Sequence, residues 1–198
     1  MKRIALLLAF VLLATAAHAE KVVGKYIMAG EEMELEAGVN DKGELVAFIR
    51  VLGEYDGDKV MMSVTGEANI NVFIKKLQYC KTKFIEWKRV AQQNNVVDFT
   101  KFYDVAFPDV ELWWMGYSDW HSAFKGDYMK PFFRVSAEGE TAFVAGGTVE
   151  DWRNMFIEKE WCIFLCNENE FDSLIKALDP GKIKLQLNAK DERDSLFQ

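Results

Sequence analysis

The residues of this chain that could recognise or transform a ligand are concentrated in one stretch, residues 112–121, which reads LWWMGYSDWH and holds three of the six tryptophans. Alternate residues of a strand point to the same face, so Trp113 and Tyr117 would lie together. Exposed aromatic rings bind carbohydrate or protein, because a flat ring gives a large contact area at little entropic cost. We therefore predict ligand binding by Trp113, Tyr117, Trp120 and His121. The alternative is that these rings only fill the core.

His121 is the residue of this stretch that could catalyse a reaction. Asp119 and Ser122 stand beside it, which would suit acid–base or nucleophilic work in a hydrolase. The members of a catalytic triad normally come from separate segments, however, and the sequence has no GxSxG motif. A hydrolase that uses His121 and nearby acidic residues is therefore the alternative to a non-enzymatic binding protein. A hydrogen bond from His121 to an acid inside a concave pocket would favour the enzyme.

The three cysteines give no sign of a metal site or a cofactor. There is no CxxC motif and no cluster of histidines, so we expect neither. Cys162 and Cys166 would lie roughly 13 Å apart along a strand, which is too far for a disulfide. Either of them could pair with Cys80, and the sequence leaves that choice open.

The N-terminus has the pattern of a secretory signal peptide at residues 1–19. Met1–Arg3 is positively charged, Ile4–Leu13 is apolar but too short to span a bilayer, and Ala17–Ala19 forms a small-x-small cleavage site. An uncleaved N-terminal anchor is the alternative. We expect export to the periplasm or the extracellular space, with no transmembrane segment after cleavage.

The charge balance argues against nucleic acid as a partner. Loss of Lys2 and Arg3 from the 24 basic residues leaves 22, against 31 acidic residues, so the mature chain carries about −9. A general nucleic-acid binder needs a surplus of basic residues. An unidentified protein or carbohydrate remains the expected partner.

One long amphipathic helix, at about residues 69–94, must position the rest of the chain. Its apolar residues recur at steps of three and four, which places them on one stripe of a helix. The stripe consists of Phe73, Leu77, Cys80, Phe84, Trp87 and Ala91. Asn69 would cap the start and Asn94 suits the exit.

A second, shorter helix is predicted at about residues 168–178. Asn167 and Glu170 resemble a capping box, and the motif Asp179–Gly181 would end the helix. The predicted strands surround the two helices, with a loop at 118–129 and a loop or helical turn at 150–158. They lie at 22–28, 33–39, 44–52, 59–64, 104–107, 110–117, 131–135, 141–145, 160–166 and 182–187.

Short turns between successive strands demand antiparallel pairing. We therefore predict an α+β fold, a largely antiparallel sheet with the two helices packed on it. Residues 20–190 should form a single domain, and residues 191–198 a disordered polar tail. The function we predict is that of an exported non-enzymatic binding or cell-envelope protein that uses the aromatic-rich strand and loop 113–121.

Overall fold

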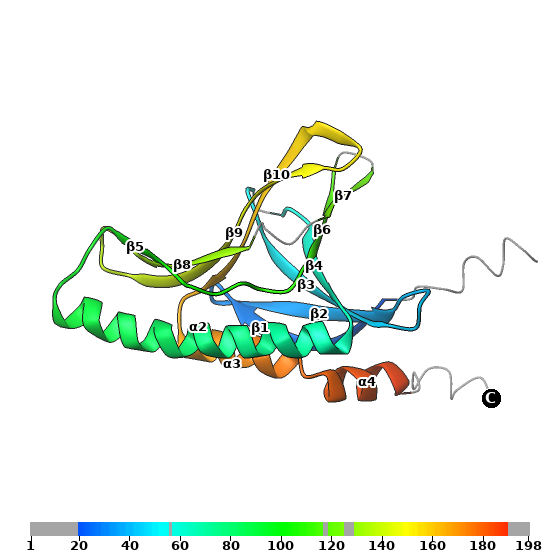
Figure 1. Cartoon of the computed structure of the whole chain (residues 1–198), viewed down its shortest axis with the longest axis horizontal. Helices are drawn as coiled ribbons and strands as arrows, with labels where there is room; N and C mark the ends of the chain where they lie inside the picture. Colours follow the sequence, from blue (N-terminus) through cyan, green and yellow to red (C-terminus); the bar gives the residue numbers. More distant parts are fainter. Residues whose placement is uncertain (1–19, 56, 117–118, 125–128, 190–198) are drawn as a thin grey trace, which may run out of the picture.

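The structure, a computed structural model, describes residues 20–55, 57–116, 119–124 and 129–189 of the 198-residue chain. Over these residues the fold is α+β, as predicted, with one long helix and two shorter helices packed on a large antiparallel sheet (Figure 1). The predicted signal peptide 1–19, the predicted tail 191–198 and Tyr117 lie outside the described residues. No helix in the described ranges is both long enough and apolar enough to span a membrane.

The elements alternate between strands and helices in the predicted order until the C-terminal end. The strands are β1 (Lys21–Met28), β2 (Glu31–Val39), β3 (Leu45–Gly53), β4 (Val60–Thr65), β5 (Phe99–Phe102), β6 (Glu111–Met115), β7 (Trp120–Phe124), β8 (Lys130–Val135), β9 (Thr141–Asp151) and β10 (Asn154–Leu165). The helices are α2 (Glu67–Gln93), α3 (Glu168–Ala177) and α4 (Pro180–Asn188).

Helix α2 packs on the sheet with the predicted stripe. Its fully buried residues are Ile70, Phe73, Leu77, Cys80, Phe84 and Ala91, whereas Trp87 is only partly buried. The predicted cap is wrong, because the N-cap residue is Gly66 and its φ of 89° suits glycine. Asn69 lies in the first turn, where its side-chain amide donates a hydrogen bond to the Thr65 carbonyl at 2.8 Å. Asn94 is the C-cap residue, as predicted.

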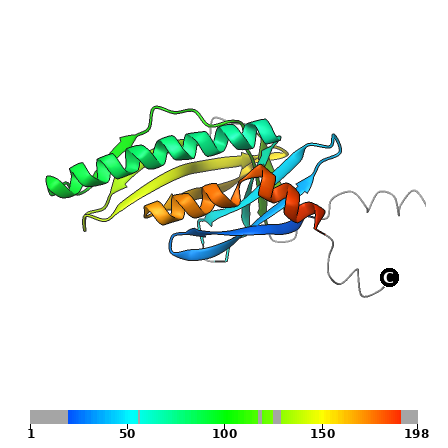
Figure 2. The same ribbon diagram turned by 90° about the horizontal axis from the view of Figure 1, so that it is seen from below.

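Phe84 shows how the layers are joined. Its ring lies 5.8 Å from that of Phe133 in β8 and 5.5 Å from that of Phe171 in α3, measured between ring centroids. An ion pair between Lys81 and Asp172, at 2.7 Å, links α2 to α3 at the surface. Figure 2 shows α2 and α3 lying side by side over the sheet. Complete burial of each phenylalanine contributes about 1.5–3 kcal/mol to folding.

The sheet consists of two parts that meet at β3. The hydrogen-bonded order is β5-β8-β9-β10-β3-β4-β6-β7, and β2, with β1 beyond it, also pairs with β3. Only Leu52 and Gly53, at the end of β3, pair with β10. The sheet also curls, so that the far end of the β9–β10 hairpin meets β7, where the Trp152 amide donates to the Ser122 carbonyl at 3.1 Å. Figure 1 shows this hairpin beside β7.

The C-terminal end differs from the prediction. Residues 182–187 were expected to form a strand, but they belong to helix α4. Helix α3 ends just before Asp179, as predicted, but Asp179 also begins the next helix: its carboxylate accepts hydrogen bonds from the Gly181 and Lys182 amides and caps α4, with Pro180 in the first turn. The alternation of apolar and polar residues that suggested a strand also occurs in this helix, in which Ile183 is buried and Leu185 is 72% exposed.

The cap of helix α3 is confirmed. The Asn167 side chain accepts hydrogen bonds from the Asn169 and Glu170 amides. Glu170 is itself buried, and its carboxylate accepts from the Cys166 amide, the Asn167 side chain and the Gly30 amide. These bonds tie the turn between β1 and β2 to the start of α3.

Three connections were also wrongly predicted. The expected loop 118–129 contains β7, and the expected loop or helical turn 150–158 is the end of the β9–β10 hairpin. The expected strand 104–107 is absent, and β5 lies a few residues earlier, paired with β8. Strand β7 pairs with the preceding strand β6, and the end of the β9–β10 hairpin contacts β7 from a later part of the sequence, which local pattern does not reveal.

The cysteines do not form a disulfide. All three are free, and Cys80 is completely buried on the α2 stripe, as predicted. Burial raises the pKa of the Cys80 thiol to about 12, so the thiol stays protonated. In the described residues no group of histidine, cysteine and acidic side chains could hold a metal ion.

Candidate ligand-binding pocket

A pocket of about 530 Å³ lies on the face of the β2–β3–β4–β6 sheet that is turned away from the core. The ladder register places it there. Ala47, Val64 and Leu112 point into the core, so the residues between them on the same strands point outward. The pocket is lined by Glu20, Gly38, Val39, Asn40, Val46, Phe48, Met61, Ser63, Thr65, Glu111, Trp113 and Trp120.

Two of the predicted binding residues, Trp113 and Trp120, line this pocket together. In the β6–β7 ladder Met115 stands opposite Trp120, and Met115 shares its face with Trp113. Both indoles therefore project from the same side of the hairpin. Trp113 is partly buried, whereas Trp120 remains 43% exposed at the rim. Phe48 from β3 and Met61 from β4 add further apolar wall.

Glu111 is the charged residue of the inner wall, next to Trp113 on the same face of β6. Its Oε1 is buried without a hydrogen-bond partner among the described residues, and so is Nε1 of Trp113. Burial raises the pKa of Glu111 to about 7, although the nearby indole N–H of Trp113 lowers this pKa in part. The two groups are thus close enough to interact, yet their geometry does not complete a hydrogen bond.

His121 lies on the opposite side of the hairpin, away from the pocket. Its register partner is Trp114, and the two rings stack with 5.6 Å between their centroids. Its Nδ1 lies 2.6 Å from Oδ2 of Asp151, a carboxylate that is almost fully buried. Because Trp120 and His121 are neighbours in a strand, they cannot serve one site.

The His121–Asp151 pair lies where β7 meets the β9–β10 hairpin. Burial alone would raise the pKa of the Asp151 carboxyl group. Hydrogen bonds from Arg153 and His121 outweigh this effect and lower the pKa to about 2. Arg153 also donates to the Trp120 carbonyl at 2.7 Å. A Cβ added to Gly116 would lie 2.5 Å from Nε2 of His121, so that nitrogen abuts the backbone.

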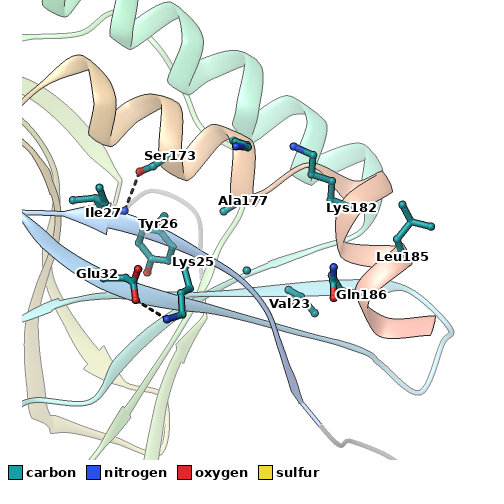
Figure 3. A pocket seen from close by; sticks show the side chains of 12 residues that line it. Val23, Lys25, Tyr26, Ile27, Glu32, Ser173, Ala177, Lys182, Leu185 and Gln186 are labelled. Atoms are coloured by element: carbon teal, nitrogen blue, oxygen red, sulfur yellow. Dashed lines mark hydrogen bonds and ion pairs between the residues drawn. The ribbon is translucent and has the colours of Figure 1, made fainter. Parts of the chain in front are cut away.

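A second hollow, of about 470 Å³, lies between β1 and the helices α3 and α4. Figure 3 shows Lys25 and Glu32 on one side of it and Lys182, Leu185 and Gln186 on the other. Lys25 is paired with Glu32 at 2.6 Å, and both side chains are more than half exposed. The charges of Lys25 and Glu32 are therefore both paired and solvated, whereas Oε1 of Glu111 is buried and has no hydrogen-bond partner among the described residues.

Only some of the residues that line the pocket were predicted from the sequence. Trp113 and Trp120 come together, His121 does not join them, and Tyr117 lies outside the described residues. Glu111 was missed, although its position two residues before Trp113 was a signal that the two share a face. Asp151 was missed because it is 30 residues from His121 in the sequence.

The chain was compared with models of protein families, with curated proteins and with solved structures, and none of the three comparisons found a match.

Proposed function

We propose that this is an exported, non-enzymatic binding protein that holds a small organic ligand in the pocket formed by β2, β3, β4, β6 and β7. One observation carries the proposal: Trp113 and Trp120 project from adjacent strands into a single concave site that also contains the Glu111 carboxyl group, whose buried Oε1 has no hydrogen-bond partner among the described residues. Ligand sites have this composition, a mostly apolar wall with a few polar groups that fix orientation.

The size of the pocket favours a small ligand over a broad protein surface. Its volume of about 530 Å³ falls within the usual range for small-molecule sites. The indoles can stack on the apolar face of a sugar ring or on small alkyl groups. Ser63, Thr65 and Asn40 line the same pocket and offer hydrogen-bonding groups. A short saccharide thus agrees better with the pocket than a second protein does.

Export is part of the proposal and is supported by the sequence of residues 1–19, with its positive start, apolar run and small-x-small site. N-terminal sequencing of protein collected outside the cytoplasm tests it. The proposal requires a mature chain that begins at Glu20. Retention of the complete chain in the cytoplasm would contradict it.

A hydrolase is the second candidate, and the short contact between His121 and Asp151 favours it. The surroundings of the pair favour a structural role instead. Nε2 of His121 abuts Gly116, and among the described residues no serine, threonine or cysteine forms a hydrogen bond with the imidazole. Hydrolysis of chromogenic esters or glycosides that disappears in His121→Ala, with the fold intact, would support the enzyme.

The binding proposal is tested by isothermal titration of the mature chain against a panel of mono- and oligosaccharides and small organic cations. Trp113→Ala and Trp120→Ala should each weaken the binding of any ligand found by about tenfold or more, since each removes a stacking surface. Phe156→Ala is the control, because that ring is 90% exposed and lies outside the pocket. Unchanged affinity in both tryptophan variants, or no binding across the panel, would refute the proposal.

A further inference from the structure

The charge of the pocket selects among ligands. Among the residues that the structure describes, its lining contains two acidic residues, Glu111 and Glu20, and no lysine, arginine or histidine. Glu111 forms no ion pair with any residue in the described ranges. The pocket wall from β3 and β4 consists of uncharged side chains, so among the described residues Glu20 is the other titratable group of the lining. An anionic ligand would be repelled here by the Glu111 carboxylate.

Solvent compensates the charge of Glu111 only in part, because this side chain is half-buried. Its Oε1 is enclosed, and the ring of Trp113 stands beside it. A half-buried carboxylate without a cation is unfavourable and is stabilised when an opposite charge enters. The aromatic rings add to this preference, because a cation is attracted to the face of an indole.

From this arrangement we infer that the pocket binds an organic cation, a quaternary ammonium or a protonated amine that carries small apolar groups. The positive centre lies against the Glu111 carboxylate and the face of Trp113, and the apolar groups contact Phe48, Met61 and Trp120. The inference rests on the proposed function, since it names the ligand class of the same pocket. Amino sugars satisfy it, whereas neutral and acidic sugars do not.

Proton binding then competes with the cation. Burial raises the pKa of Glu111 to about 7, so the carboxyl group is mostly protonated at about pH 5.5 and mostly ionised at about pH 8. Only the ionised form attracts the ligand. Affinity should therefore be constant above about pH 8 and decline by more than about tenfold between about pH 8 and about pH 5.5.

Three probes of matched shape test the inference by isothermal titration: choline, the neutral isostere 3,3-dimethyl-1-butanol, and the anion 3,3-dimethylbutanoate. At about pH 8 choline should bind at least about tenfold more tightly than the neutral alcohol, and the anion should not bind measurably. Glu111→Gln should reduce the advantage of choline by about tenfold, leaving the smaller part that the indole faces contribute, and should leave the affinity of the alcohol unchanged. Glu158→Gln, at an exposed site outside the pocket, should change neither.

A second variant guards against misfolding of Glu111→Gln. Thr65→Lys adds an ammonium group to the pocket wall and should weaken choline by about tenfold while Glu111 stays in place. Equal affinity for choline and the alcohol, or choline binding unaffected by both variants, would overturn the cation inference and leave the binding proposal standing. Absence of choline binding would also overturn it. The binding proposal fails separately, through the tryptophan variants and the wider panel.

Discussion

Replacement of Glu111 by glutamine should change how the stability of the protein depends on pH. In the folded chain burial raises the pKa of Glu111 from 4.5 to about 7. Between these values the folded chain holds a proton that the unfolded chain releases. The free energy of unfolding therefore decreases as pH rises from about 4.5 to about 7 and is constant above that. Glutamine cannot ionise, so the variant lacks this contribution.

The magnitude follows from the size of the pKa change. One pH unit corresponds to 1.36 kcal/mol, so the complete change would amount to about 3 kcal/mol. Glu111 is only half-buried, and solvent screening reduces the value to about 1–2 kcal/mol. Relative to the natural protein, Glu111→Gln should gain that amount of stability between about pH 5 and about pH 8.5.

Urea unfolding of both proteins at several pH values measures this difference. The informative quantity is how the difference in free energy of unfolding between the two proteins changes with pH. The other titrating groups are common to both proteins, so their contributions cancel. The exposed control Glu158→Gln should show no such change. A difference between Glu111→Gln and the natural protein that stays constant across this pH range, or that decreases as pH rises, would refute the claim that Glu111 is desolvated.

Three further outcomes test the fold. Phe84→Ala should lower the free energy of unfolding by about 3–5 kcal/mol in urea melts, because it removes a fully buried ring. Gly146→Ala should prevent folding or cost several kcal/mol, because a Cβ there would lie 2.6 Å from Cα of Cys162, whereas Gly38→Ala, with open space around it, should cost about 1 kcal/mol or less. Asp151→Ala should cost about 2–3 kcal/mol near neutral pH, because it removes a buried carboxylate that accepts hydrogen bonds from His121 and Arg153. Because the pKa of Asp151 is lowered from 3.8 to about 2, roughly 2 kcal/mol of this deficit should be lost as pH falls from about 4 towards 2, which acid titration of both proteins would show.

The helices show what local sequence can and cannot determine. The α2 stripe was predictable because its apolar period runs without interruption across the helix and requires one buried face. Helix α4 was not, since alternation of lysine or glutamine with apolar residues suits an edge strand equally well locally. The decisive feature is the cap that Asp179 provides for α4. The motif Asp179–Gly181 contains this capping residue, but the same motif is also typical of the end of a helix.

The pocket was also predictable from local sequence only in part. Trp113 was predictable as one face of an aromatic strand, but its meeting with Trp120 requires the pairing of β6 with β7, in a stretch expected to be a loop. The state of Glu111 depends on enclosure by residues from β3 and β4, which no spacing rule encodes. The partner of His121 could not be predicted, because Asp151 is 30 residues away in the sequence whereas Asp119 and Ser122 are its neighbours.

The central claim is that Trp113, Trp120 and Glu111 form one cation-binding site, and indole N–H resonances of ¹⁵N-labelled protein test it most directly. Addition of choline at about pH 8 should shift the resonances of Trp113 and Trp120 and leave those of Trp87, Trp152 and Trp161 in place. The same shifts should require about tenfold more choline in Glu111→Gln. Shifts confined to other tryptophans, or none at any choline concentration, would contradict the account.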